Sequence, residues 1–179
     1  MSDTIKVPSF IATMVILLMA TAVLAQDPHQ QIETLVESTK SSLVNRKLEI
    51  LETYFLTERD LNAYVGRKYQ WTNKDVDTIR IVEQLASHKL RMERTFQYIL
   101  QQTELHCSCN LAEAMAANKY VIISEKGRNG VPKPMEIFIP LKGCDCENYE
   151  MWLRIEDCFF LGNELKLGDG FKLEKKPTF

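Results

Sequence analysis

The chain lacks the short motifs that mark the best-known classes of nucleotide-binding and hydrolytic enzymes. It has no Gly-rich phosphate loop, no Gly-x-Ser-x-Gly nucleophile motif and no His-Glu-x-x-His metal-binding motif. Basic and acidic residues are interspersed and the formal net charge is −2, so we expect no basic surface of the kind that binds a phosphate backbone. The sequence therefore predicts no nucleic-acid partner, and it indicates no cofactor.

Two further absences concern domain organisation and processing. The chain has no Pro-, Gly- or Ser-rich linker, no low-complexity tract and no internal repeat. It has no Asn-x-Ser/Thr sequence either, so we expect no N-glycosylation. Residues 26–179 have the length of one domain, which is enough to bury a hydrophobic core.

Residues 1–25 have the layout of a secretory signal peptide. Lys6 precedes an uncharged run that continues to Ala25, with its apolar centre at residues 11–19. Small residues at the end of the run predict cleavage after Ala25, and hence a secreted, extracellular mature protein. A retained membrane anchor is the less favoured alternative, because a spanning helix needs about 20 apolar residues. No second stretch is apolar enough to span, so we expect no stable membrane insertion after cleavage.

Apolar residues at spacings of three and four predict three helices in the first half of the mature chain. The first covers residues 30–56, with a bend near 41–45, and a short second helix covers 59–65. The third is capped by Thr72 or Asn73 and extends to about residue 89.

The second half of the chain is predicted to be mostly strands. Residues 95–107 are rich in Phe, Tyr, Ile and Thr and predict a long strand, whereas 111–118 predict a helical turn or a loop. Shorter strands are expected at 120–125, 135–141, 149–155 and 164–167. Pro140 cannot donate to a strand ladder, so its strand should lie at an edge or break there. Helices followed by strands predict an α+β domain, with N-terminal helices packed on an antiparallel sheet of four to six strands.

Three segments resemble the nuclear transport factor 2-like superfamily. They are residues 48–61 (LEILETYFLTERDL), 69–85 (YQWTNKDVDTIRIVEQL) and 149–169 (YEMWLRIEDCFFLGNELKLGD). The resemblance implies that helices and a curved antiparallel sheet form a cone with a pocket inside. The Cys-x-Cys pairs and the Pro-containing turn at 132–134 depart from any family-wide pattern. The family includes enzymes, ligand binders, dimeric transport factors and accessory domains, so membership implies a fold and not an activity.

Five cysteines are candidates for disulfides: Cys107, Cys109, Cys144, Cys146 and Cys158. A zinc site made from two Cys-x-Cys arms is the alternative, but zinc arms usually place two or more residues between ligands. An extracellular location favours disulfides, and we expect no metal. Residues two apart on a strand share a face, so Cys107 and Cys109 should not pair with each other. We expect bridges from this pair to Cys144 and Cys146, or to one of them and Cys158.

Two bridges leave one cysteine over. That cysteine is either buried and inert or linked to a second copy of the chain in a homodimer. A reactive thiol is less favoured, because His106 and Cys107 are neighbours on the predicted strand and would point to opposite faces.

His106, Glu104 and Tyr98 are the weak candidates for catalysis. Together with Gln102 they share one face of the predicted strand at 95–107, and such a set inside a cone could transfer protons. The alternative, which we favour, is that Glu104 and His106 lie in water.

The sequence therefore predicts a secreted, disulfide-containing domain without assignable catalysis, which binds a small ligand or a protein partner. The alternative function is a small extracellular enzyme with a proton-transfer site inside the cone. A disulfide-linked homodimer with a structural role is a third, weaker reading.

Overall fold

The structure is a computed structural model that describes residues 27–62, 74–107, 110–115, 119–124, 134–146 and 149–175, with the backbone alone at 74–80, 143–146, 149 and 175. The expected signal peptide and its cleavage site after Ala25 lie outside these residues. No helix in the described ranges is long and apolar enough to cross a membrane.

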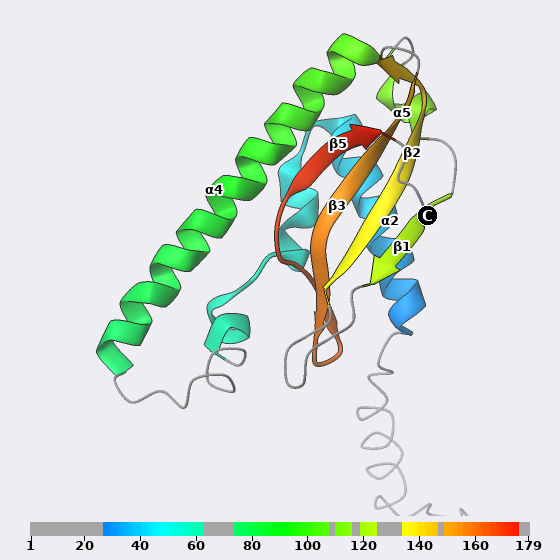
Figure 1. The fold of residues 1–179 in the computed structure, drawn as a ribbon. Helices are drawn as coiled ribbons and strands as arrows, with labels where there is room; N and C mark the ends of the chain where they lie inside the picture. The colour runs from blue at the N-terminus through cyan, green and yellow to red at the C-terminus, as the bar shows by residue number, and fades with distance from the viewer. Residues whose placement is uncertain are drawn as a thin grey trace, which may run out of the picture.

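Helices precede a five-stranded antiparallel sheet in the described part of the chain (Figure 1). The helical elements are α2 (Pro28–Asn45), the 3-10 helix η1 (Leu48–Tyr54), a short α-helix at 58–62, where the short second helix was expected, α4 (Lys74–His106) and α5 (Leu111–Ala114). The strands are β1 (Val121–Ser124), β2 (Met135–Cys146), β3 (Tyr149–Leu161), β4 (Glu164–Leu167) and β5 (Phe171–Lys175). The prediction of an α+β domain with an antiparallel sheet of four to six strands is confirmed.

Helix α2 begins and ends with well-formed caps. The Asp27 side chain accepts a hydrogen bond from the His29 backbone N–H at 3.1 Å, and Pro28 occupies the first turn, where no N–H is needed. Arg46 adopts a left-handed conformation with φ 56°, which ends the helix. The predicted single helix over 30–56 is therefore two elements, and the expected bend is the end of α2 followed by η1.

Helix α4 includes residues 95–106 of the segment predicted to be a strand, so that prediction is wrong. Its buried residues recur at spacings of three and four, as a helix requires: Met92, Phe96, Ile99, Leu100 and Thr103. The Thr103 hydroxyl donates to the Ile99 carbonyl oxygen at 2.9 Å and so satisfies its polar group within the helix. Aromatic and β-branched content favoured a strand, but burial of an apolar stripe decided the outcome.

The sheet has the order β1-β2-β3-β4, and β5 also pairs with β3 (Figure 1). Alternation in β2 and β3 is as predicted, since Ile137 and Ile139 face the core opposite Ile155 and Leu153. Pro140 lies beyond Phe138, which is the last residue of β2 that pairs with β1. On its β1 side, β2 is therefore an edge at Pro140. Proline has no backbone N–H, and at an edge this costs no interstrand hydrogen bond.

The hairpin of β3 with β4 and β5 bends at its middle. Asp157 has φ 49°, and its carbonyl oxygen accepts a hydrogen bond from the Gly168 N–H at 2.9 Å. On the far side of the bend, the Glu156 N–H donates to the Gly170 carbonyl oxygen at 3.0 Å. The ladder thus continues through residues 168–170 and joins β4 and β5 into one bent arm.

One core joins the helices to a single face of the sheet. It contains side chains from α2, η1, α4, α5 and strands β2 to β5. The largest fully buried members are Phe96, Leu35, Leu43, Leu51, Met92, Ile99, Ile137, Ile139, Leu141, Leu153, Ile155 and Leu167. Burial of each such side chain contributes about 1.5–3 kcal/mol.

Helix α4 approaches β5 closely at Gly170. A Cβ atom at position 170 would lie 2.8 Å from Cγ2 and 2.9 Å from Cβ of Thr95. Such distances are shorter than real carbon–carbon contacts, so this position accepts only glycine while the helix keeps its place.

His88 of α4 contacts both the segment after η1 and the connection between β4 and β5. Its Nε2 atom accepts a hydrogen bond from the Leu56 N–H at 3.4 Å, and its ring packs edge-on against Phe55. Because Nε2 is an acceptor, the imidazole is neutral. Burial lowers the pKa of His88 below its ordinary value of 6.5, and the charge of Arg91 adds to this effect; a hydrogen bond to the Gly168 backbone and the charge of Asp169 partly offset it.

Gly170→Ala should destabilise the fold because the added methyl group meets Thr95. We expect a loss of about 1–3 kcal/mol in the free energy of unfolding, measured by urea denaturation. Thr95→Ala removes Oγ1 and Cγ2, so the same glycine substitution should cost less in that background. Equal costs in both backgrounds would contradict the close approach.

The stability of the protein should fall as pH drops below about 6.5. The unfolded chain takes up a proton at His88 there, whereas the folded chain resists it, so protonation favours unfolding. His88→Gln should therefore show a smaller loss of unfolding free energy between pH 7 and pH 5. The exposed His29→Gln is the control and should follow the wild-type profile; parallel profiles for all three proteins would refute the role of His88.

Candidate functional site

The described part of the chain contains a pocket of about 580 Å³ where the ends of three helices meet. We call it the helix-end pocket. Its lining residues come from the end of α2, the last turns of α4, and the start of α5: Leu43, Val44, Arg46, Leu100, Thr103, Glu104, Cys107, Asn110, Leu111 and Ala112. Its volume lies within the range of about 300–1,000 Å³ that is typical of small-molecule sites.

Local hydrogen bonds shape the walls of the helix-end pocket. The Ser42 hydroxyl donates to the Lys47 carbonyl oxygen at 2.6 Å and fixes the turn that follows α2. On the opposite wall, the Asn110 side chain accepts a hydrogen bond from the Glu113 N–H at 2.9 Å and caps α5. Each wall is therefore fixed by a hydrogen bond between a side chain and the backbone of the same wall.

The floor of the helix-end pocket is apolar. Leu43 and Leu100 are buried in the core, and Leu111 packs against it. Thr103 is also buried, but its hydroxyl donates within α4, to the carbonyl oxygens of Ile99 and Leu100. Leu43 and Leu100 present little surface to the pocket, so Leu111 supplies most of the apolar contact from these three leucines, beside polar lining residues.

The mouth of the pocket carries two opposite charges. Arg46 Nη2 and Glu104 Oε1 form an ion pair, and their side chains are 65% and 53% exposed. Exposed ion pairs contribute only about 0–1 kcal/mol, because water and salt screen them. The pair can therefore exchange partners with a charged ligand at little cost.

A disulfide lies at the edge of the helix-end pocket. Cys107, which lines the pocket, is disulfide-bonded. Cys158 is a free thiol. No three His, Cys, Asp or Glu side chains among the described residues are arranged to hold a metal ion.

Cys158 forms no disulfide, so the expected alternative of a bridge between Cys158 and the Cys107/Cys109 pair is wrong. It lies in the core, with its side chain on the inner face of β3 and 0% exposed, and burial raises the pKa of its thiol. A thiol in that position can neither reach a second chain nor act as a nucleophile in the folded state. The reading of an inert, buried cysteine therefore applies to Cys158, and the dimer-linking reading does not.

The three candidate catalytic residues do not converge. All lie on α4, where successive residues turn by about 100°, so Tyr98, Glu104 and His106 point in three different directions. Tyr98 is 50% exposed, Glu104 is at the pocket mouth, and His106 is half-buried at the end of the helix. Their grouping depended on the predicted strand at 95–107 and is lost with it.

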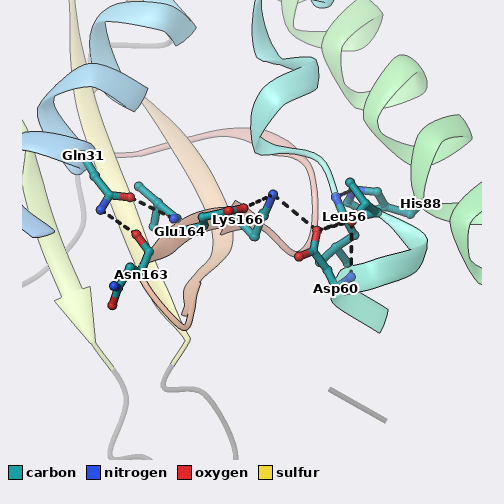
Figure 2. Close-up of polar contacts among 9 residues, drawn as sticks. Gln31, Leu56, Asp60, His88, Asn163, Glu164 and Lys166 are labelled. Carbon is teal, nitrogen blue, oxygen red and sulfur yellow. Dashed lines mark hydrogen bonds and ion pairs between the residues drawn. The ribbon is translucent and has the colours of Figure 1, made fainter. Parts of the chain in front are cut away.

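A second polar group, which we call the Lys166 cluster, joins β4 to the helical layer (Figure 2). Lys166 is only 4% exposed, and its Nζ lies 3.3 Å from Asp60 Oδ2 and 3.0 Å from Glu164 Oε2. Asp60 Oδ2 also accepts hydrogen bonds from the N–H and hydroxyl of Thr57. Burial raises the pKa of Asp60, but these hydrogen bonds and the charge of Lys166 lower it overall.

The Lys166 cluster has the properties of a structural tie. Its cation is balanced by two carboxylates, as a buried charge requires, and none of its members lines the helix-end pocket. Beside it, Gln31 of α2 bridges the β3–β4 turn, donating to the Asn163 carbonyl oxygen at 2.8 Å and accepting from the Leu165 N–H at 3.0 Å (Figure 2). These contacts hold α2 and the short helix at 58–62 against β4.

Arg154 forms a further charged group on the other face of the sheet. It pairs with Glu136, with Glu174 at 3.3 Å and with Glu156 at 3.6 Å, and its guanidinium lies over the Phe138 ring. Burial raises the pKa of Glu156, against the opposing effect of Arg154. The four side chains join β2, β3 and β5, so we interpret them as cross-strand stabilisation.

Comparisons of the chain with protein-family models, with curated proteins and with solved structures found no match. The similarity to the nuclear transport factor 2-like superfamily therefore stays a prediction.

Cys158 should be unreactive in the native protein. Treatment with iodoacetamide should leave the Cys158 peptide unmodified, and the same reagent in guanidinium chloride should alkylate it, as measured by peptide mass spectrometry. Cys158→Ser should lower the free energy of unfolding more than Cys158→Ala, because it buries a hydroxyl group among apolar side chains. Alkylation of Cys158 under native conditions would contradict its burial.

Proposed function

We propose that this protein is a secreted, non-catalytic binding domain and that the helix-end pocket holds a small ligand with an apolar body. The observation that carries the proposal is the pocket itself, with an apolar floor and an exchangeable ion pair at its mouth. The lining combines apolar side chains, which can contribute affinity, with polar side chains, which can set the orientation of a ligand.

Binding is favoured over catalysis because the residues that could transfer protons are not grouped. Tyr98, Glu104 and His106 diverge on α4, and Lys166 and Arg154 each form ion pairs with carboxylates of their own clusters. A protein partner stays as the alternative to a small ligand, since Val44 and Leu105 expose apolar surface at the same end of the helices.

The secreted location follows from the signal-like segment before residue 26, and the disulfide at Cys107 supports it, since disulfides persist in oxidising compartments. We also propose the nuclear transport factor 2-like cone as the fold family, supported by the order of helical elements before an antiparallel sheet. The helix-end pocket differs from the site that this family implies, because among described residues it is lined by helices and their connection rather than by the sheet.

Filling the helix-end pocket should abolish ligand binding without unfolding the protein. Ala112→Trp places a large side chain on an exposed lining position, and we expect at least a tenfold weaker binding of the neutral fluorescent probe N-phenyl-1-naphthylamine. Lys89→Trp adds the same side chain to an exposed position outside the pocket and serves as the control. Binding of the probe by the Ala112 variant at wild-type affinity would refute this site.

A further inference from the structure

The mouth of the helix-end pocket can recognise two opposite charges at once. Arg46 follows the last residue of α2, whereas Glu104 lies on α4, so the two charges come from opposite sides of the opening. Among the described residues that line the pocket, Arg46 and Glu104 are the two that form an ion pair with each other. Both side chains are long and more than half exposed, so they can separate and admit a charged group between them.

The charges restrict which ligands fit. An anionic head group beside Arg46 would face the unpaired carboxylate of Glu104, and a cationic head group beside Glu104 would face the unpaired guanidinium of Arg46. A head group with both charges replaces the single ion pair by two, and it leaves neither side chain without a partner. Complementary charges of this kind contribute to specificity more than to affinity.

The pocket below the mouth is too large for a head group alone. Its volume is about 580 Å³, within the range of small-molecule sites. Leu43, Leu100 and Leu111 supply apolar lining in this space, of which Leu111 is the most exposed. A ligand that uses both the mouth and the floor therefore combines a charged head with an apolar tail.

We propose that the ligand of the helix-end pocket is a single-tailed zwitterionic amphiphile. Its anionic group binds Arg46, its cationic group binds Glu104, and its apolar tail lies on the floor. This inference rests on the proposed binding function, and it adds the chemical class of the ligand. Lysophospholipids and other zwitterions with one acyl or alkyl chain share this chemistry.

Three probes with the same tail and different heads test the inference. Dodecylphosphocholine carries both charges, dodecyl phosphate is anionic, and dodecyltrimethylammonium is cationic. Titration calorimetry with the full mature chain, below the concentration at which each probe forms micelles, gives the three affinities. We expect the zwitterion to bind about three- to tenfold more tightly than either singly charged probe.

Charge variants at the mouth should change the preference in opposite directions. Arg46→Gln should favour the cationic probe and Glu104→Gln the anionic probe, each by about threefold relative to wild type. The double exchange Arg46→Glu with Glu104→Arg should restore the preference for the zwitterion. Arg94→Gln and Glu93→Gln change exposed charges of α4 outside the pocket and should leave all three affinities unchanged.

Each outcome separates this inference from the function on which it rests. If the three probes bind equally and Ala112→Trp abolishes all binding, the pocket is a ligand site but the zwitterion is excluded as its specific ligand. If none of the three binds while the neutral naphthylamine probe does, the inference is again overturned and the binding function stands. If Ala112→Trp weakens neither the charged probes nor the neutral probe, the proposed function itself is refuted.

Discussion

The packing of α4 against the sheet is the contact on which most of this structure depends. One apolar stripe on a single helix meets the inner face of the strands, and it includes Met92, Phe96 and Ile99. Gly170 permits the close approach of the helix to β5, and His88 joins the same helix to the segment that follows η1. Because a long helix is rigid, its position also decides where its last turns meet α2 and α5, and hence where the helix-end pocket forms.

The ion pairs of this protein differ in burial, and burial determines whether a charge can exchange its partner. Lys166 is buried and pairs with the buried Asp60 and the exposed Glu164, so its charge is not left unpaired, and the contact holds β4 to the helical layer. Arg46 and Glu104 form a similar pair by composition, but they lie in water, where exchange of partners costs little. Burial thus separates the pair that maintains the fold from the pair that is suited to recognition.

Prediction from sequence succeeded where residue type and residue spacing did not favour different structures. Strict alternation identified β2 and β3, and Gly162, with φ 63°, marked the turn into β4. It failed at 95–107, where the residue types favour a strand and the spacing of Phe96, Ile99 and Thr103 favours a helix. Spacing is the stronger signal there, because it determines whether one face can be buried continuously. β5 was not predicted, since it is short and follows a bend in the ladder at Gly168.

The candidate site was beyond sequence reasoning for a related reason. Leu43, Leu100 and Leu111 look like ordinary core residues, and no motif links them. The sequence by itself determined the class of fold, the order of helices before strands and the alternation of the sheet, because these depend on local periodicity. Only the tertiary structure decided which cysteine is buried, that the three candidate catalytic side chains diverge, and that the ends of three helices enclose a pocket. These depend on contacts between residues far apart in the chain, which periodicity does not encode.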